Sequence, residues 1–490
     1  MTTGRARGRT SARLVVAALL TVLLAPRSGG ADVLPPPAVG GPTTVTVDAG
    51  APVAELNRRL VGFGWHDGAV PLASIAPLHP DLVRIDANLE TISTGPGAPL
   101  RLDDLLARVA EVRGAGGEPL VILSYLPAWM ATPNTGPRDP TRVRPADLAA
   151  WERLVHDVVL ALATAPSPAL RFEAWNEPDV PLFWQDSPLA WVDLAEASGR
   201  AIATVEQETG LDLAFGGPAM AVPDPAYLVP FLERFRDATL PLDFVSWHYY
   251  GNYPFFGPDG AEFPLTAPIQ PIVGRPNPIA SPSAYPPQVD FVRSLTELTL
   301  AGSGRPMPEL VIDEWNLSAA GFDRRHDTAA GAAFAAGVLS ELQRAGLDAA
   351  AFFRATDTSG VPGEHGAVRV DGTPKPVWWV FDLWRRLADT VVTSRVDGPS
   401  ADLFVVATAA PDRVVVLLSS FSGDPSRTDL QQVTLDLTGL RSEPVAATVR
   451  RIDDRHPAAA GSEPAVLDGW RVALEVPLPG VALVEIRLAA

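Results

Sequence analysis

The stretch RFEAWNEPDV, residues 171–180, is an apolar run that stops at Trp175 and is followed by an amide, a carboxylate and a proline. A buried carboxylate costs free energy unless it is paired or used in chemistry. Pro178 has no backbone N–H for a sheet, so it favours the end of a strand and the start of a loop. The stretch therefore predicts a buried strand that delivers Glu177 to the edge of a sheet.

The same pattern recurs along the chain as short apolar segments that end in polar or aromatic residues. Segments with helical spacing separate them, such as RLDDLLARVAEVRGAG (101–116), which ends in a glycine stop. The eight strand candidates are 59–66, 81–88, 119–130, 170–178, 211–220, 242–250, 309–316 and 348–357.

Eight strand–helix units predict an α/β chain with a (β/α)8 TIM barrel over residues 59–390. The runner-up is an open doubly wound sheet, which favours a G-x-G-x-x-G turn after its first strand. GFGWHDGA (62–69) lacks that spacing. The proline-rich excursion 251–287, which follows the sixth strand, is either a disordered insertion or a wall over the site.

After residue 390 the apolar period changes to 2, as in RVVVLLSSFS (413–422). Residues 391–490 are therefore predicted to form a β-sandwich domain. The early segment 43–58 begins with the alternating run TTVTVDAG and is expected to supply an extra strand to that sandwich.

Composition narrows the function classes. The formal net charge is −18 over 490 residues, which disfavours nucleic acid and anionic membranes as partners. The chain has no cysteine, which excludes disulfides, thiolate metal sites and a cysteine nucleophile. The composition says nothing about the oligomeric state.

The first 30 residues have the order of a secretory signal peptide. Four arginines precede the apolar run LVVAALLTVLLA (14–25), and small residues follow near 28–31. Residues 31–42 are a Pro/Gly linker. We therefore expect a secreted protein with no membrane segment after cleavage, and an uncleaved N-terminal anchor is the alternative.

Two carboxylates end strands that face each other across the predicted barrel mouth. Glu177 follows the fourth strand, and the seventh strand, LVIDEWN (310–316), ends in Asp313 and Glu314. Chemistry in such barrels lies at the C-terminal ends of the strands. Glycoside hydrolysis needs two carboxyl groups, one to protonate the leaving oxygen and one to attack the anomeric carbon or activate water.

At these motifs the chain resembles glycoside hydrolase family 39, the family of β-xylosidases and α-L-iduronidases. The carrying stretches are LSYLPAWMA (123–131), FEAWNEPDVPLFW (172–184), DFVSWHYY (243–250), LVIDEWNLS (310–318), HDTAAGAAF (326–334) and RATDTSG with HGAVRVDGTPKPVWW (354–379). The resemblance implies a retaining barrel enzyme without metal or cofactor, with Glu177 as acid/base and Glu314 as nucleophile. It also implies that Asn176 bonds the sugar 2-hydroxyl and that the substrate is an oligosaccharide or polysaccharide, with a xyloside as the expected glycone.

The remaining candidates support these roles. Glu177 must stay protonated, which the apolar Trp175 and the charge of Glu314 favour. Arg84 is the natural donor that keeps Glu314 ionised. Sugar rings present apolar faces with polar rims, which aromatic and polar side chains suit. The expected substrate-binding residues are Asn176, Arg84, His248, Tyr250, Trp129, Trp184, Arg354 and Asp357.

Two departures from the family pattern leave the glycone open. Phe353 stands where many relatives have Trp, with Arg354 next to it, and Asp86 stands where the family often has His. Arg354 is expected to pair with Asp357 or Asp313, or alternatively with a carboxylate on the substrate. The alternatives are therefore another glycone, such as a uronic acid, arabinose or glucose, or a non-catalytic carbohydrate-binding barrel.

Overall fold

The computed structural model describes residues 43–65, 70–133, 136–238, 240–252, 279–398 and 402–489. The signal peptide and linker predicted over 1–42 lie outside the described residues, as does most of the 251–287 excursion. Within the described ranges, no helix combines the length and apolar character that a membrane span requires.

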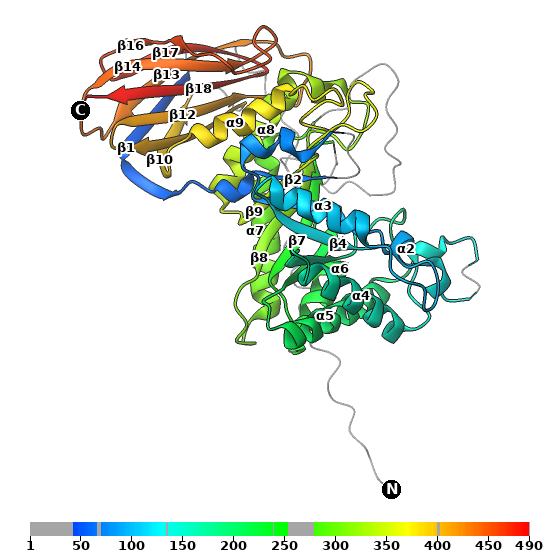
Figure 1. The fold of residues 1–490 in the computed structure, drawn as a ribbon. Helices are drawn as coiled ribbons and strands as arrows, with labels where there is room; N and C mark the ends of the chain where they lie inside the picture. Colours follow the sequence, from blue (N-terminus) through cyan, green and yellow to red (C-terminus); the bar gives the residue numbers. More distant parts are fainter. Residues whose placement is uncertain are drawn as a thin grey trace, which may run out of the picture. The chain divides into compact units, whose positions relative to one another are not determined.

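Eight parallel strands close into a barrel, which confirms the predicted (β/α)8 fold (Figure 1). Neighbouring strands in sequence are neighbours in the barrel, and β2 closes it by pairing with β9. The strands are β2 (Gly62–Gly64), β3 (Leu82–Asp86), β4 (Glu118–Leu123), β5 (Arg171–Ala174), β6 (Ala214–Met220), β7 (Phe244–Tyr250), β8 (Glu309–Asn316) and β9 (Ala349–Phe353).

Apolar side chains fill one end of the barrel. Leu82, Leu120, Phe244, Val311 and Ala349 form a buried cluster from the N-terminal halves of their strands. Gly216 and the backbone of Phe244 pack closely at this end. A Cβ at Gly216 would lie 2.3 Å from the backbone oxygen of Phe244, so only glycine fits. Because apolar side chains fill this end, we expect the polar functional residues at the opposite, C-terminal end of the strands.

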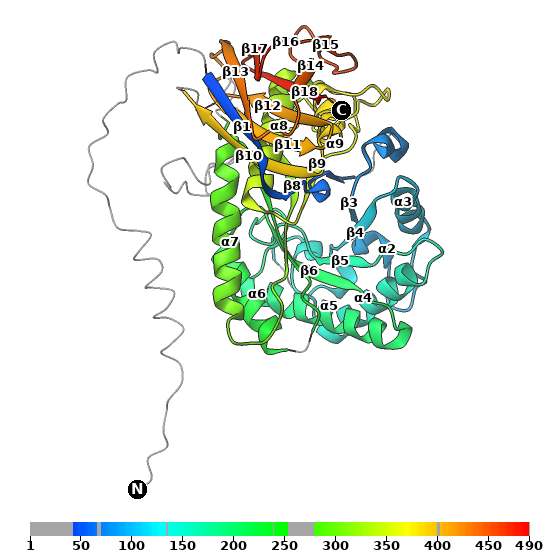
Figure 2. The same cartoon turned by 90° about the vertical axis from the view of Figure 1, so that its left-hand side faces the viewer.

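Helices follow the strands on the outside of the barrel (Figure 2). Side-chain caps start several of them, as at Asp147, which accepts from Ala149 N at 2.9 Å. The helices are α2 (Leu89–Ile92), α3 (Asp103–Gly114), α4 (Leu148–Ala163), α5 (Pro188–Thr209), α6 (Pro225–Asp237), α7 (Tyr285–Leu300), α8 (Ala329–Ala345) and α9 (Pro376–Arg386).

The first strand is the exception among the described residues. Between β2 and β3 the structure describes two 3-10 turns, η2 (Leu72–Ser74) and η3 (Ala76–Leu78), in place of an α-helix. Prolines at 71, 77 and 80 limit regular helix in this short segment. Further short 3-10 turns are η1 (Arg58–Leu60), η4 (Ala128–Met130), η5 (Pro140–Arg142), η6 (Pro282–Ala284) and η7 (Arg324–Asp327).

The C-terminal domain is one ten-stranded sheet with strand order β15-β14-β18-β12-β11-β10-β1-β13-β17-β16. Its two ends approach each other, since β14 contacts β16, so the predicted sandwich takes the form of a nearly closed, mostly antiparallel sheet. The strands are β1 (Thr43–Glu55), β10 (Thr390–Asp397), β11 (Leu403–Ala410), β12 (Arg413–Ser420), β13 (Leu430–Thr438), β14 (Pro444–Ile452), β15 (Glu463–Pro464), β16 (Val466–Asp468), β17 (Arg471–Pro477) and β18 (Gly480–Leu488).

The early strand β1 lies inside this sheet, antiparallel to β10 and parallel to β13 (Figure 1). Alternate residues such as Val45 and Val47 are fully buried in its core. The sheet also contacts the barrel through α8: Ser419 Oγ donates to Ala333 O, and the rings of Phe334 and Phe421 lie 5.3 Å apart. The N-terminal strand and the C-terminal strands therefore fold as one unit beside the barrel.

Candidate active site

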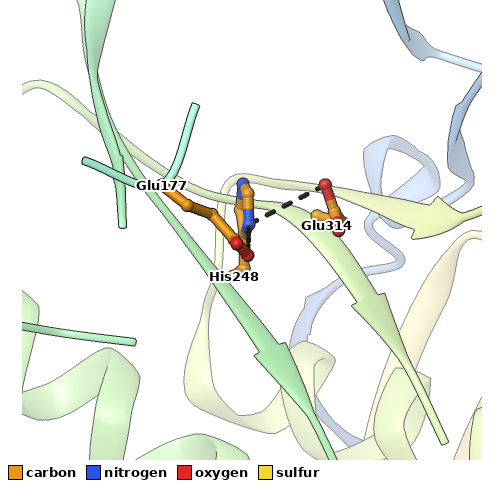
Figure 3. A group of neighbouring side chains, drawn as sticks. All are labelled: Glu177, His248 and Glu314. Atoms are coloured by element: carbon orange, nitrogen blue, oxygen red, sulfur yellow. Dashed lines mark hydrogen bonds and ion pairs between the residues drawn. The ribbon is translucent and has the colours of Figure 1, made fainter. Parts of the chain in front are cut away.

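Polar side chains converge at the C-terminal mouth of the barrel. Figure 3 shows His248 between the carboxyl groups of Glu177 and Glu314. The converging residues come from β3 (Arg84), the turn after β5 (Asn176 and Glu177), β7 (Ser246, His248 and Tyr250) and β8 (Asp313 and Glu314). The sequence-predicted carboxylate pair is therefore brought together from strands far apart in the chain.

The turn after β5 has an unusual backbone that aims Glu177. Trp175 and Glu177 both have positive φ, 71° and 43°, in the left-handed region that costs a non-glycine residue roughly 1–3 kcal/mol. Packing holds the turn: Trp175 is fully buried, and its indole donates to Phe183 O at 2.9 Å. Glu177 N also donates to Ala219 O on β6 at 2.8 Å. The local strain is thus offset by burial and hydrogen bonds that fix the carboxyl group at the mouth.

Glu177 has the protonation behaviour of a general acid. It is only 5% exposed, and burial raises the pKa of its carboxyl group to about 7, although the positive charge of Arg84 opposes the rise. His248 Nδ1 lies 2.8 Å from Glu177 Oε1. The apolar surroundings expected from the sequence therefore account for the shift, and the expected contribution of the Glu314 charge is not among its causes. A carboxyl group with this pKa holds a proton near neutral pH.

Glu314 is surrounded by donors. Arg84 Nη1 donates to Glu314 Oε2 at 3.0 Å, which is the contact expected from the sequence. The Tyr250 hydroxyl donates to the other carboxylate oxygen of Glu314. Donors to both oxygens hold the carboxyl group of Glu314 in one orientation, as a nucleophile at the barrel mouth requires.

The two carboxyl groups are close enough for a retaining reaction. One oxygen of Glu177, one of Glu314 and His248 Nδ1 all lie within 4.8 Å of one another. Retaining glycosidases hold their carboxyl groups about 5–5.5 Å apart, whereas inverting enzymes separate them by about 6.5–9.5 Å to admit a water. The gap suits direct attack by one carboxylate.

The same three residues, Glu177, His248 and Glu314, could by spacing hold a metal ion. The sequence showed no ligand pattern around His248, so this grouping arises only in the fold. Arg84 places its positive charge 3.0 Å from Glu314, and a protonated Glu177 is a poor ligand. These two features favour acid and nucleophile roles over cation binding.

Asn176 and Trp129 are further predicted substrate contacts that follow the C-terminal ends of their strands. Asn176 Oδ1 accepts from Arg84 Nη2 at 2.9 Å, which fixes the amide beside Glu177. Trp129 lies in η4 with 41% of its surface exposed, and its indole donates to Ser93 O at 3.1 Å. The exposed ring of Trp129 remains a candidate sugar platform.

Trp184 and Asp357 are placed differently from the prediction. Trp184 is 2% exposed and packs edge-on against Trp175, with ring centroids 5.1 Å apart, so its ring supports the turn and is closed to a sugar. Asp357 is 3% exposed and accepts from Lys375 Nζ at 2.9 Å and Gly366 N at 2.8 Å. Both residues therefore serve the scaffold behind the site.

Arg354 pairs within its own loop. Its Nη2 donates to Thr358 Oγ1 at 2.9 Å and lies 3.5 Å from Glu364 Oε1. Neither expected partner, Asp357 or Asp313, is used: Asp357 is held by Lys375, and Asp313 lies 2.9 Å from Arg84. A structural partner for Arg354 is thus present, but it is Glu364.

Sequence reasoning missed Glu173, Ser246 and His365. Glu173 and Ser246 are fully buried under the mouth, inside strands β5 and β7. A charged residue inside an otherwise apolar strand was the signal for Glu173. His365 lies 5.2 Å from the ring of Phe353 and 6.4 Å from that of Tyr250, and burial lowers its pKa to about 3, which leaves it neutral.

Comparison with known proteins relates the chain to a glycosidase family. A family model described as "Glycosyl hydrolases family 39" matches residues 103–260, a range that includes Glu177 and His248 and ends before Glu314. A β-xylosidase of Geobacillus stearothermophilus is 30% identical over 247 residues, which are 47% of this chain and 45% of that protein. The chain therefore matches less than half the length of this curated relative.

Solved structures share the fold over most of the chain. A monomeric β-xylosidase from Caulobacter crescentus has a TM-score of 0.68 at 19% identity, covering 91% of this chain and 100% of that one. The family 39 enzyme from Xanthomonas axonopodis pv. citri has a TM-score of 0.68 at 18% identity, covering 92% and 98%. The combination of this barrel with this sheet domain is therefore already seen in solved structures.

Proposed function

We propose, since the chain belongs to glycosyl hydrolases family 39, that it hydrolyses O-glycosidic bonds with retention, using Glu177 as acid/base and Glu314 as nucleophile. The observation that carries the proposal is the approach of the two carboxyl groups to within 4.8 Å at the barrel mouth. They differ in environment: Glu177 is buried with a raised pKa, and Glu314 accepts from Arg84 and Tyr250.

In the first step a Glu314 oxygen attacks the anomeric carbon while the bond to the leaving oxygen breaks. The proton of Glu177 passes to that oxygen, so the alcohol departs neutral and Glu177 is left ionised. In the second step Glu177 takes a proton from water, and the water oxygen displaces Glu314 from the anomeric carbon. The carboxyl groups regain their starting states, and the sugar keeps its anomeric configuration.

His248 and Arg84 contact the proposed catalytic carboxyl groups. His248 Nδ1 lies 2.8 Å from Glu177 Oε1 and 3.8 Å from Glu314 Oε2 (Figure 3). Arg84 donates to Asn176 and to Glu314, which holds the nucleophile beside the residue expected to bond the sugar 2-hydroxyl. Glu177 has the raised pKa of an acid and Glu314 is held by two donors, and both features weigh against a non-catalytic barrel.

The proposed substrate is a β-xyloside in xylo-oligosaccharides. The support is the Geobacillus stearothermophilus relative, whose name is β-xylosidase. Phe353, whose ring centroid lies 6.1 Å from that of Tyr250, stands where many family members have Trp as a floor for the sugar. That difference keeps arabinosides, glucosides and uronides as the alternative glycones.

A panel of nitrophenyl glycosides tests the proposal. The purified chain is assayed on the β-xyloside, β-glucoside, α-arabinoside and β-glucuronide, with Glu314→Gln as the inactive control. Release of nitrophenol from the xyloside above all others supports the proposal. Preference for another sugar would identify that sugar as the glycone in place of xylose. No release from any glycoside would favour the carbohydrate-binding alternative.

Residues 1–30 are proposed to direct export, after which the chain acts outside the cell. The support is the order of arginines, apolar run and small residues in the sequence. Expression of the full chain in a secreting bacterium, with N-terminal sequencing of the protein in the medium, tests this. A cell-bound product that retains residues 1–30 would favour the anchor.

A further inference from the structure

A buried carboxylate lies beneath the proposed catalytic pair and has no role in the steps above. Glu173 is on β5, four residues before Glu177, and its side chain is fully buried. An ionised carboxylate at such depth is costly unless it is paired and hydrogen-bonded. Glu173 meets this condition, and each of its partners leads to one member of the catalytic pair.

The first path runs through Arg84. Arg84 Nε and Nη2 each lie 2.9 Å from Glu173 Oε2. The same guanidinium donates from Nη1 to Glu314 at 3.0 Å and from Nη2 to Asn176 at 2.9 Å. Arg84 is itself fully buried, so its planar fork has one orientation that satisfies Glu173, Asn176 and Glu314 together.

The second path runs through Ser246. Its hydroxyl donates to Glu173 Oε1 at 2.5 Å and accepts from Ala219 N at 3.1 Å. Ala219 O in turn accepts from Glu177 N at 2.8 Å. This path fixes the β6 backbone that supports the strained turn of Glu177. One carboxylate therefore contacts the supports of both Glu314 and Glu177.

The charges around Glu173 agree with an ionised group. Burial raises the pKa of Glu173, but the Arg84 charge and the hydrogen bonds from Asp313 and Ser246 outweigh burial and leave the pKa below its ordinary value. Burial and the Glu173 charge raise the pKa of the neighbouring Asp313 well above its ordinary value, and the Arg84 charge opposes that rise. Arg84 thus pairs with Glu173, Asp313 and Glu314 together.

We propose that Glu173 is a positioning residue of the active site, which holds Arg84 against Glu314 and holds Ser246 under the Glu177 turn. The inference rests on the proposed retaining hydrolysis, because it assigns Glu314 as the group to be held. Without the Glu173 carboxylate, Nε and Nη2 of Arg84 lose their contacts to Oε2, and only Asp313 and Asn176 are left to hold the guanidinium at Glu314. A misplacement of about 1 Å in such a site costs on the order of 10²-fold in rate.

Covalent labelling of Glu314 tests the role directly. Dinitrophenyl 2-deoxy-2-fluoro-β-xyloside carries a leaving group that needs little acid assistance, so the rate of adduct formation reports mainly on the nucleophile. The variants are Glu173→Gln and Ser246→Ala. Intact mass gives the rate constant at saturating reagent and the half-saturating concentration, and thermal unfolding gives the stability of each variant.

Glu309→Gln is the matched control. Glu309 is a barrel carboxylate on β8 that also pairs with two arginines, Arg59 at 2.6 Å and Arg171 at 3.0 Å. It begins β8, whereas Glu314 lies near the end of that strand. Loss of a paired carboxylate at this end should lower the unfolding temperature without slowing the labelling of Glu314.

The expected result is that Glu173→Gln slows labelling at saturation by about 10- to 100-fold with little change in half-saturation. Ser246→Ala slows it less, and Glu309→Gln labels at the parent rate. Labelling of Glu173→Gln at the parent rate would overturn the inference. If that variant does not fold, Ser246→Ala decides: parent-rate labelling of it in a folded protein likewise overturns the role. A parent chain that acquires no adduct would instead refute the proposed function.

Discussion

Replacement of Glu177 by Gln should make the folded chain more stable at neutral pH, although it removes the proposed acid. Burial raises the pKa of Glu177 from its ordinary 4.5 to about 7, against the opposing charge of Arg84. In the unfolded chain the group ionises near its ordinary value. Folding therefore carries a cost that begins near pH 4.5, grows as the pH rises, and is complete above about pH 7.

The size of the effect follows from the two pKa values. The difference between about 7 and 4.5 corresponds to roughly 3 kcal/mol in the free energy of unfolding. Gln has the shape of a protonated Glu, and its amide can donate to His248 Nδ1, which lies 2.8 Å from the carboxyl group. The free energy of unfolding of the variant should exceed that of the parent by an amount that grows from zero near about pH 4 to this value near about pH 7.5. Above that pH the difference should stay constant.

Urea unfolding of the parent and Glu177→Gln across that pH range measures the difference directly. Glu309→Gln is again the control, with the opposite sign. Burial raises the pKa of Glu309, but Arg59 and Arg171 leave it below its ordinary value. That variant should be less stable than the parent at neutral pH, and the difference should shrink as the pH falls through this lowered pKa. A difference between parent and Glu177→Gln that does not change with pH would refute a protonated Glu177 in the folded chain.

Three other results are expected. Glu177→Ala should lose roughly 10²–10⁴ in rate on xylo-oligosaccharides and much less in the first step on dinitrophenyl xylosides, and equal losses in single-turnover assays would exclude Glu177 as the acid. Arg354→Met should lower activity on a neutral xyloside and on the matching uronide alike, since Arg354 contacts Thr358 and Glu364; loss on the uronide alone, by about 1.5–3 kcal/mol, would identify a substrate carboxylate. Lys375→Met should lower the free energy of unfolding by about 3–5 kcal/mol, because it leaves Asp327 and Asp357, each 2.8 Å from Nζ, without their cation; an unchanged urea midpoint would contradict this.

The sequence was sufficient to predict the barrel because each strand is a short apolar run with its own terminator. Residues 171–174 and 309–316 lie in strands where the pattern placed them. The position of β1 in the C-terminal sheet also follows from its alternation, in which Val45 and Val47 are buried. The closure of ten strands into one sheet depends on contacts between its ends, such as β14 with β16, and no local pattern encodes these contacts.

The candidate site was predictable where a residue ends a strand. Glu177 and Glu314 were found in this way, and Arg84 could be matched to Glu314 by charge. Trp184 was misassigned because an aromatic residue after a strand looks the same in sequence whether it lines a pocket or packs on Trp175. Glu173 was missed because it lies inside its strand, where only three-dimensional packing reveals Arg84 as its partner.

The configuration of the first-formed sugar tests the central claim most directly. Proton NMR during rapid hydrolysis of a β-xyloside distinguishes the anomers before mutarotation mixes them. With the carboxyl oxygens of Glu177 and Glu314 within 4.8 Å, double displacement predicts that β-xylose appears first and the α-anomer follows by mutarotation. Initial release of α-xylose would show single displacement by water and would contradict the assignment of Glu314 as the nucleophile.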